Sequence, residues 1–375
     1  MSPKIRWLLL ALAWAAGLFA WALRGGESYK FVQLGAQNSE TLGSTPVFIR
    51  HELKTDALSA HAATIAISPQ GAAHAFWFAG TREGAGDVQI YSAQRSNGLW
   101  SIPEPVRSVK QTIRDQWRFV RKVGNPVAHF DAQGRLHLFF VSVSLGGWAT
   151  SHINHTYSDD DGKNWSRSRI LHLSPFLNIS TLARAVPVEF ADGSLGLPAY
   201  HESARKFPEL LRITRDGNVL GKTRMSAQGG LLQPTLATQS EQEAIALLRD
   251  GGPLRKIHLQ RTLDGGAHWS KAIPLDVANP NASIAVARLK DGQFLLAYNP
   301  RIDDRSELAL AISSDGTTWQ KVKVIESAAG GEFSYPTLAS DRTGTLHLVY
   351  TWQRKHIRHV MFNRAWLSSE SEDKP

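Results

Sequence analysis

The chain has 375 residues and 42% of them are hydrophobic, which is enough to bury a large core in one domain. It contains no cysteine, which excludes disulfide bonds, thiol catalysis and cysteine-bound zinc. The formal net charge is +9, yet no block of Lys and Arg with interleaved aromatic residues occurs, so we expect no nucleic-acid partner; a basic surface fits an anionic polysaccharide, a lipopolysaccharide or a membrane face at least as well.

Residues 1–26 have the pattern of an export segment. Lys4 and Arg6 precede an uncharged, apolar run over 7–23. Positive residues ahead of such a run indicate a signal peptide, and the run is also long enough to span a bilayer without cleavage. We therefore expect an exported protein, periplasmic or at the cell surface, either cleaved or anchored in the inner membrane through 7–23. The rest divides into a linker over 27–45, a folded body over 46–367 and an acidic tail over 368–375.

Six short turns, each followed by an apolar strand, recur along the body. They lie at 69–71, 132–134, 191–193, 240–243, 290–292 and 342–344. A period of about 50 to 60 residues is typical of a solenoid or a propeller. The strands alternate or run apolar, and no stretch of the body keeps a helical period. We predict an all-β fold, a six-bladed β-propeller with about four strands in each blade. A β-sandwich would give no reason for a sixfold repeat.

Three further turns share one pattern, a hydroxyl residue and an aspartate followed by glycine and tryptophan. They lie at 158–165, 262–269 and 313–319. The hydroxyl and the carboxylate can bond to the turn's own backbone, the glycine accepts a positive φ, and the tryptophan packs beneath. We therefore interpret these turns as hairpin corners that perform no chemistry.

These Asp-box turns and the blade period resemble the sialidase (neuraminidase) superfamily, in its bacterial BNR-repeat branch, over roughly residues 45–366. The resemblance implies an exo-glycosidase that hydrolyses a terminal acidic sugar, sialic acid or a related one, with retention and without a cofactor. Its nucleophile is a tyrosine, because an anionic nucleophile would be repelled by the carboxylate at the anomeric carbon. We expect no metal site, since the histidines show no HExxH or paired-ligand spacing.

The last blade contains the best match to the nucleophile of that family. Tyr335 lies in Glu332-Phe333-Ser334-Tyr335-Pro336, which resembles the nucleophilic tyrosine segment. The resemblance places Asp87, in the first blade, at the acid/base aspartate. A phenol with a pKa of about 10 needs a base close by, and Glu332, Glu202 or His201 are the candidates.

Other positions match segments that bind the substrate. Arg249 and Arg305 match two arginines of the clamp that holds the substrate carboxylate, and Arg82 and Glu83 match an acidic and basic segment of the first blade. His201 ends a strand at the place where propellers present side chains to the central axis.

Two positions depart from the family pattern. His61 stands where the family has its first arginine, and an imidazole cannot form the bidentate fork that a guanidinium offers to a carboxylate. Gln233 stands where the family has the glutamate that deprotonates the nucleophile, and a neutral amide cannot accept that proton.

These departures leave three functions open: the hydrolase, a lyase for uronate polysaccharides, and a membrane-tethered propeller that binds a glycan or a protein without catalysis. In the lyase, His61 or His201 would be the base and Tyr335 the acid. Candidate platforms for sugar stacking are Trp77, Trp117, Trp148 and Trp352. The basic strand that contains Arg354 is expected at the rim or at a partner surface, and the sequence leaves the oligomeric state open.

Overall fold

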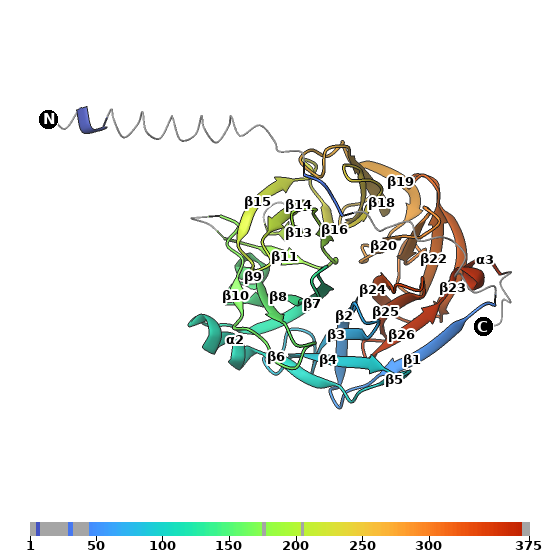
Figure 1. The fold of residues 1–375 in the computed structure, drawn as a ribbon, viewed down its shortest axis with the longest axis horizontal. Helices are drawn as coiled ribbons and strands as arrows, with labels where there is room; N and C mark the ends of the chain where they lie inside the picture. The colour runs from blue at the N-terminus through green and yellow to red at the C-terminus, as the bar shows by residue number, and fades with distance from the viewer. Residues whose placement is uncertain (1–4, 8–28, 33–44, 175–177, 204–205, 370–375) are drawn as a thin grey trace.

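The computed structural model describes residues 5–7, 29–32, 45–174, 178–203 and 206–369. In these residues, six antiparallel sheets of four or five strands surround a common axis (Figure 1). The prediction of an all-β, six-bladed propeller is therefore confirmed.

The blades follow one another along the chain, and the first strand of each lies nearest the centre (Figure 1). The first blade contains β2 (Ser59–Ile67), β3 (Ala73–Gly80), β4 (Gln89–Ser96), β5 (Leu99–Trp100) and β6 (Glu104–Ser108). The second blade contains β7 (Lys122–Phe130), β8 (Leu136–Val143), β9 (Ser151–Ser158) and β10 (Arg169–Ile170). The third blade contains β11 (Thr181–Ala183), β12 (Val188–Glu189), β13 (Leu195–Glu202), β14 (Lys206–Ile213) and β15 (Val219–Arg224). The fourth blade contains β16 (Leu231–Thr238), β17 (Ala244–Asp250), β18 (Lys256–Thr262) and β19 (Ile273–Ala278). The fifth blade contains β20 (Ala285–Arg288), β21 (Phe294–Tyr298), β22 (Glu307–Ser313) and β23 (Gln320–Ser327). The sixth blade contains β24 (Phe333–Ser340), β25 (Leu346–Trp352), β26 (His356–Phe362) and β1 (Phe48–Leu53). Helices α2 (Val109–Gln116) and α3 (Arg364–Ser368) lie at the outer edge (Figure 1).

The ring is closed by the start of the body. Strand β1 pairs antiparallel with β26, from Phe48 opposite Phe362 to Leu53 opposite Ile357. The last blade is therefore built from both ends of the folded body. The pairing of β1 with β26 therefore closes the ring.

The second strand of each blade is covered on both faces, which explains its apolar sequence. All eight residues of β3 and all eight of β8 are buried. Apolar side chains of neighbouring blades meet in shared clusters, as Leu247 of β17 and Leu296 of β21 do. The core therefore lies between the blades.

The three Asp-box turns form the hairpin corners predicted from the sequence. In the second turn, Thr262 Oγ1 donates to Asp264 Oδ1 at 2.8 Å and accepts from Gly266 N at 3.0 Å, and Asp264 Oδ1 accepts from His268 N at 2.9 Å. The first and third turns repeat these bonds, and all three glycines at this position have a positive φ.

Part of the range expected to be a linker is packed onto the propeller. Phe31 is 1% exposed, forms a β-bridge with Phe190 and belongs to a core cluster of the third and fourth blades. Lys30 pairs with Glu241 at 2.9 Å. Beyond Trp7, the apolar run over 7–23 lies outside the described residues, as do residues 370–375 of the expected tail. Among the residues that are described, no helix has the length and apolar character needed to cross a membrane.

Candidate functional site

One end of the innermost strands carries the same unusual backbone conformation in every blade. A residue other than glycine has a positive φ in or just before each of these strands: Ala62, Asn125, Ser180, Gln233, Asn281 and Tyr335. In four blades the residue lies at a β-bulge, where the pairing with the next strand shifts register. A bulge re-aims side chains, and such backbone strain is typical of functional sites. This end of the blades is therefore where a functional site is expected.

Tyr335 stands in a positively charged environment. Its ring lies 5.3 Å from the guanidinium carbon of Arg184 and 5.7 Å from that of Arg305. The ring of His61 packs against it, with 4.4 Å between centroids. His61 is 1% exposed, and neither of its ring nitrogens has a hydrogen-bond partner among the described residues. Burial, helped by the charges of nearby arginines, holds the pKa of His61 well below its usual range, so the imidazole is neutral.

Two of the predicted substrate-binding arginines meet through Asn281. Arg249 donates from Nε to Asn281 Oδ1 at 2.8 Å, and Arg305 donates from Nη2 to the Asn281 carbonyl at 2.9 Å. Arg249 also donates to Gln233 Oε1 at 3.0 Å, and Gln233 Nε2 donates to the Tyr200 hydroxyl at 3.2 Å. Both ends of the Gln233 amide are therefore used. The remaining nitrogen of Arg249, Nη2, has no acceptor among the described residues and is free for a ligand.

Glu332 joins this group through a chain of charged side chains. It accepts from Arg354 Nε at 2.7 Å and from Ser334 Oγ at 3.1 Å, and it lies 3.4 Å from Arg305 Nη1. Burial would raise the pKa of Glu332, but the bond and charge of Arg354 and the charge of Arg305 outweigh it and lower the pKa. Arg354 Nη1 also donates to Glu83 at 2.6 Å. The prediction that Arg354 lies at the rim or at a partner surface is wrong, because the turn between β25 and β26 brings it into the site.

Sequence reasoning assigned no role to Arg184, which directly follows β11. It is 3% exposed and reaches across the centre of the ring, donating to the carbonyl oxygens of Ala63 at 3.0 Å and Tyr335 at 2.7 Å and to Thr337 Oγ1 at 3.1 Å. No carboxylate among the described residues pairs with it, and burial lowers its pKa to about 10. Arg184 therefore ties the third blade to the first and sixth and holds the backbone of Tyr335.

Other candidates do not contact this group. Asp87 is exposed, and its two carboxylate oxygens accept from the backbone nitrogen and the hydroxyl of Thr81, at 2.9 and 3.0 Å. The hydrogen bond from the Thr81 backbone lowers the pKa of Asp87. Within the same loop the side chain of Arg82 is exposed, and Glu83 is the residue that reaches the arginines.

The two candidates of the third blade, His201 and Glu202, bond to neighbouring residues of that blade. His201 bonds to Glu209 at 2.7 Å and stacks on Phe207 with 4.4 Å between centroids, which leaves no ring nitrogen for Tyr335 because the other one faces the Ile179 carbonyl. The backbone nitrogen of Glu202 donates to Ser180 Oγ at 3.0 Å. In the described part of the chain, no group of three or more His, Asp or Glu residues gathers as a metal site.

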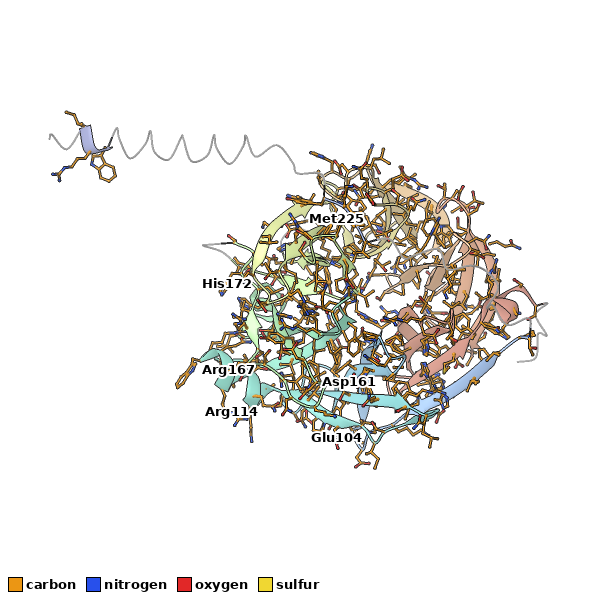
Figure 2. All side chains as sticks on the ribbon, viewed as in Figure 1. Glu104, Arg114, Asp161, Arg167, His172 and Met225 are labelled. Carbon is orange, nitrogen blue, oxygen red and sulfur yellow. The ribbon has the colours of Figure 1, made fainter. Side chains whose placement is uncertain are left out.

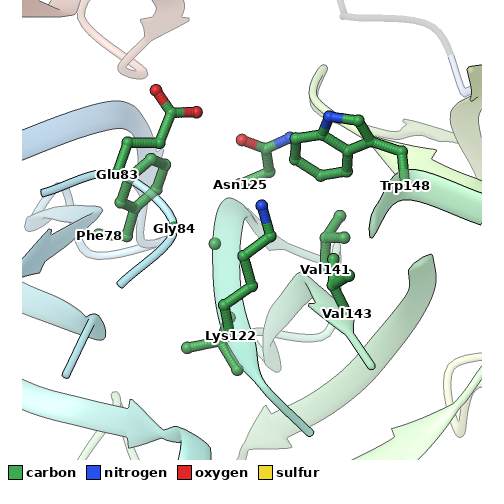
Figure 3. Close-up of a pocket in the computed structure, with 10 residues that line it drawn as sticks. Phe78, Glu83, Gly84, Lys122, Asn125, Val141, Val143 and Trp148 are labelled. Carbon is green, nitrogen blue, oxygen red and sulfur yellow. The ribbon is translucent and has the colours of Figure 1, made fainter. Parts of the chain in front are cut away.

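A pocket lies beside this group, between the first and second blades (Figure 3). Its lining includes Glu83 and Asn125, which is the positive-φ residue of the second blade. Of the four candidate stacking tryptophans, Trp148 lines the pocket, whereas Trp77 is buried in the core. The pocket is thus connected to the arginine cluster by Glu83.

Known proteins are similar to this chain in fold. The model of the BNR repeat-like domain matches residues 71–348. A sialidase named Hadza microbial sialidase Hz136 has 14% identity and a TM-score of 0.71, over 84% of this chain and 68% of that one. The NanB sialidase from Streptococcus pneumoniae has 10% identity and a TM-score of 0.66, over 87% and 71%. A protein of unknown function from Dyadobacter fermentans has 14% identity and a TM-score of 0.69, over 84% and 99%.

No curated protein matches the chain. The family model covers most of the body, and the solved structures share its architecture of blades around an axis. The chain belongs to the family of BNR repeat-like domains.

Proposed function

We propose that the protein is a glycoside hydrolase of the sialidase type, which releases a terminal acidic sugar, sialic acid or a related one, from a glycan. The observation that carries this proposal is the position of Tyr335 beside Arg184 and Arg305, with Arg249 joined to Arg305 through Asn281. A carboxylate held by Arg249 and Arg305 would place the adjoining anomeric carbon in front of the phenol.

The reaction proceeds in two steps. In the first step the Tyr335 hydroxyl passes its proton to the Glu332 carboxylate and its oxygen attacks the anomeric carbon, while the glycosidic bond breaks and the leaving oxygen takes a proton from Glu83. In the second step Glu83 takes a proton from the water that hydrolyses the glycosyl-tyrosine, and Glu332 returns its proton to the Tyr335 oxygen, so the product forms with overall retention. The positive charge of Arg184 and Arg305 favours the developing phenolate. We assign the acid/base role to Glu83, because its carboxylate belongs to the cluster, whereas that of Asp87 is bonded within its own loop.

The proposal is tested with a fluorogenic ketoside of sialic acid and a panel of acidic glycosides. Tyr335→Phe removes only the hydroxyl, which has no hydrogen bond with any described residue, so the fold and the sugar binding are expected to survive. We expect turnover to fall by about 10³-fold or more. Activity that persists in this variant would show that the nucleophile is another residue.

One observation favours a second candidate, the propeller that binds an acidic glycan without catalysis. Gln233 stands at the position of the family's base, and its amide is held at both ends by Arg249 and Tyr200. A binder would retain the glycans of the same panel on an array and release no product. A lyase would be distinguished by an unsaturated product that absorbs in the ultraviolet.

A further inference from the structure

The pocket beside the arginine cluster contains a cation, Lys122, that forms no ion pair with any described residue. Lys122 is the first residue of β7, and its half-buried side chain runs along the pocket to Trp148, with 4.3 Å from the ammonium nitrogen to the centre of the indole ring (Figure 3). The ammonium forms no hydrogen bond or ion pair with any residue in the described ranges. Burial lowers the pKa of Lys122, although the negative charge of Glu83 opposes this effect.

The carboxylate that lines the pocket is already bound elsewhere. Glu83 accepts from Arg354 at 2.6 Å, and Arg354 bonds in turn to Glu332. Removing an ammonium from water without a partner costs free energy. The Lys122 ammonium is therefore suited to bind an anionic group of a ligand.

The remaining walls of the pocket suit a sugar ring. Phe78, Val141 and Val143 form an apolar side, and Trp148 is 37% exposed, which leaves part of its indole for stacking. Asn125 offers an amide for hydroxyl groups (Figure 3). The pocket adjoins Tyr335 through His61, whose ring lies 4.4 Å from the Tyr335 ring and 5.6 Å from that of Phe78 in the pocket wall, between ring centroids.

We propose that this pocket is a second subsite, in which Lys122 binds the acidic group of the sugar unit next to the unit held at Tyr335. The inference rests on the proposed function and narrows its substrate class to oligosaccharides with two adjacent acidic units. The terminal unit lies at the arginines and the penultimate unit in the pocket.

The test uses Lys122→Met, which keeps a long apolar side chain and removes the charge, in the Tyr335→Phe background so that no ligand is consumed. Lys163→Met, at an exposed lysine of the first Asp-box turn, is the matched control. Binding is measured by calorimetry for disialic acid and for the same disaccharide with its inner carboxylate converted to a methyl ester. The methyl ketoside of sialic acid is the ligand with a single sugar unit. A digalacturonate, with its inner carboxylate free or as the methyl ester, tests uronic acids in the same way.

We expect the diacidic disaccharide of the preferred sugar to bind about tenfold more tightly than its ester, which corresponds to about 1.4 kcal/mol. This preference should vanish in Lys122→Met and remain in Lys163→Met. Equal affinities of the two variants for every diacidic ligand would overturn the subsite. A loss that is as large for the single sugar would also overturn it, because Lys122 would then serve the terminal unit. If the preference is found but no glycoside is hydrolysed by the unmodified protein, the subsite stands and the hydrolase proposal fails.

Discussion

The two ends of the blades use their charged residues in opposite ways. The second blade shows that these ends are opposite. Gly124, at the start of β7 near the site, pairs with Val141 of β8. Ser158, which begins an Asp-box turn, pairs with Leu136 at the other end of β8, beside the end of β7. At the Asp-box end, Asp264 bonds to residues within four positions of itself. At the site end, Arg184 bonds to residues more than a hundred positions away. One end is held by local turns, and the other is held by bonds between blades that leave nitrogen atoms free for a ligand.

The largest difference between two neighbouring residues is expected at the site end, within a single loop. Glu83→Gln should lower kcat by about 10²-fold or more, because general acid catalysis contributes at least this factor. Asp87→Asn, four residues further on, should leave kcat within about twofold. The rates are compared on a fluorogenic ketoside. The reverse order of effects would return the acid/base role to Asp87 and show that the loop rearranges on binding.

The next effect concerns the stability of the site end. Arg184→Met keeps most of the volume but removes the donors to Ala63 and Tyr335, so we expect the free energy of unfolding to fall by about 3 kcal/mol. Urea denaturation measures this change, and Arg167→Met, at an exposed arginine near the outer edge (Figure 2), is the control. A loss no larger than that of the control would mean that the blades close without this tie.

A smaller effect is expected at the other end. Asp264→Ala removes the acceptor for Thr262 and His268 and should lower the free energy of unfolding by about 1 kcal/mol. Glycan binding should stay unchanged, because this corner lies at the far end of its blade. A change in affinity for the acidic disaccharides would show that the two ends are coupled.

The smallest effect is a dependence of stability on pH, to which the Asp-box end contributes most. Buried His155 and His359 each bond to a second histidine, at 3.0 and 3.1 Å, and burial holds the pKa of both well below the ordinary value. As the pH falls below about 6.5, these histidines become protonated in the unfolded chain but stay neutral in the folded chain, so the free energy of unfolding decreases.

Melting temperatures between pH 7.5 and 5.5 should therefore decline, and His155→Gln should decline less. His61→Gln provides the comparison at the site end, since burial also lowers the pKa of His61. An equal decline in the unmodified protein and in both variants would contradict this account.

Much of the fold could be predicted because its signals are local. The Asp-box turns and the turns that end in glycine each need only a few neighbouring residues, and their repetition yields the number of blades. The closing strand β1 was not predicted, because nothing in its six residues specifies a partner about 300 positions away. The burial of Phe31 in the expected linker has the same cause.

The candidate site was predicted in part. Arg249, Arg305, Glu332 and Glu83 are brought together with Tyr335 and His61, whereas Asp87 and His201 bond within their own surroundings. Arg184 and Arg354 were missed as site residues, since an arginine beside a strand or in a turn looks the same whether it faces solvent or the centre. Their roles depend on which blades meet.

The sequence by itself determined the blade, its corners and the sixfold count, because a hairpin turn and an apolar strand are decided by contacts between residues close in the chain. Only the tertiary structure decided which charges meet at the centre, because the ring brings the third blade against the first and sixth. That closure places a buried arginine on the backbone of Tyr335 and sets the ammonium of Lys122 against Trp148, without an ion-pair partner among the described residues.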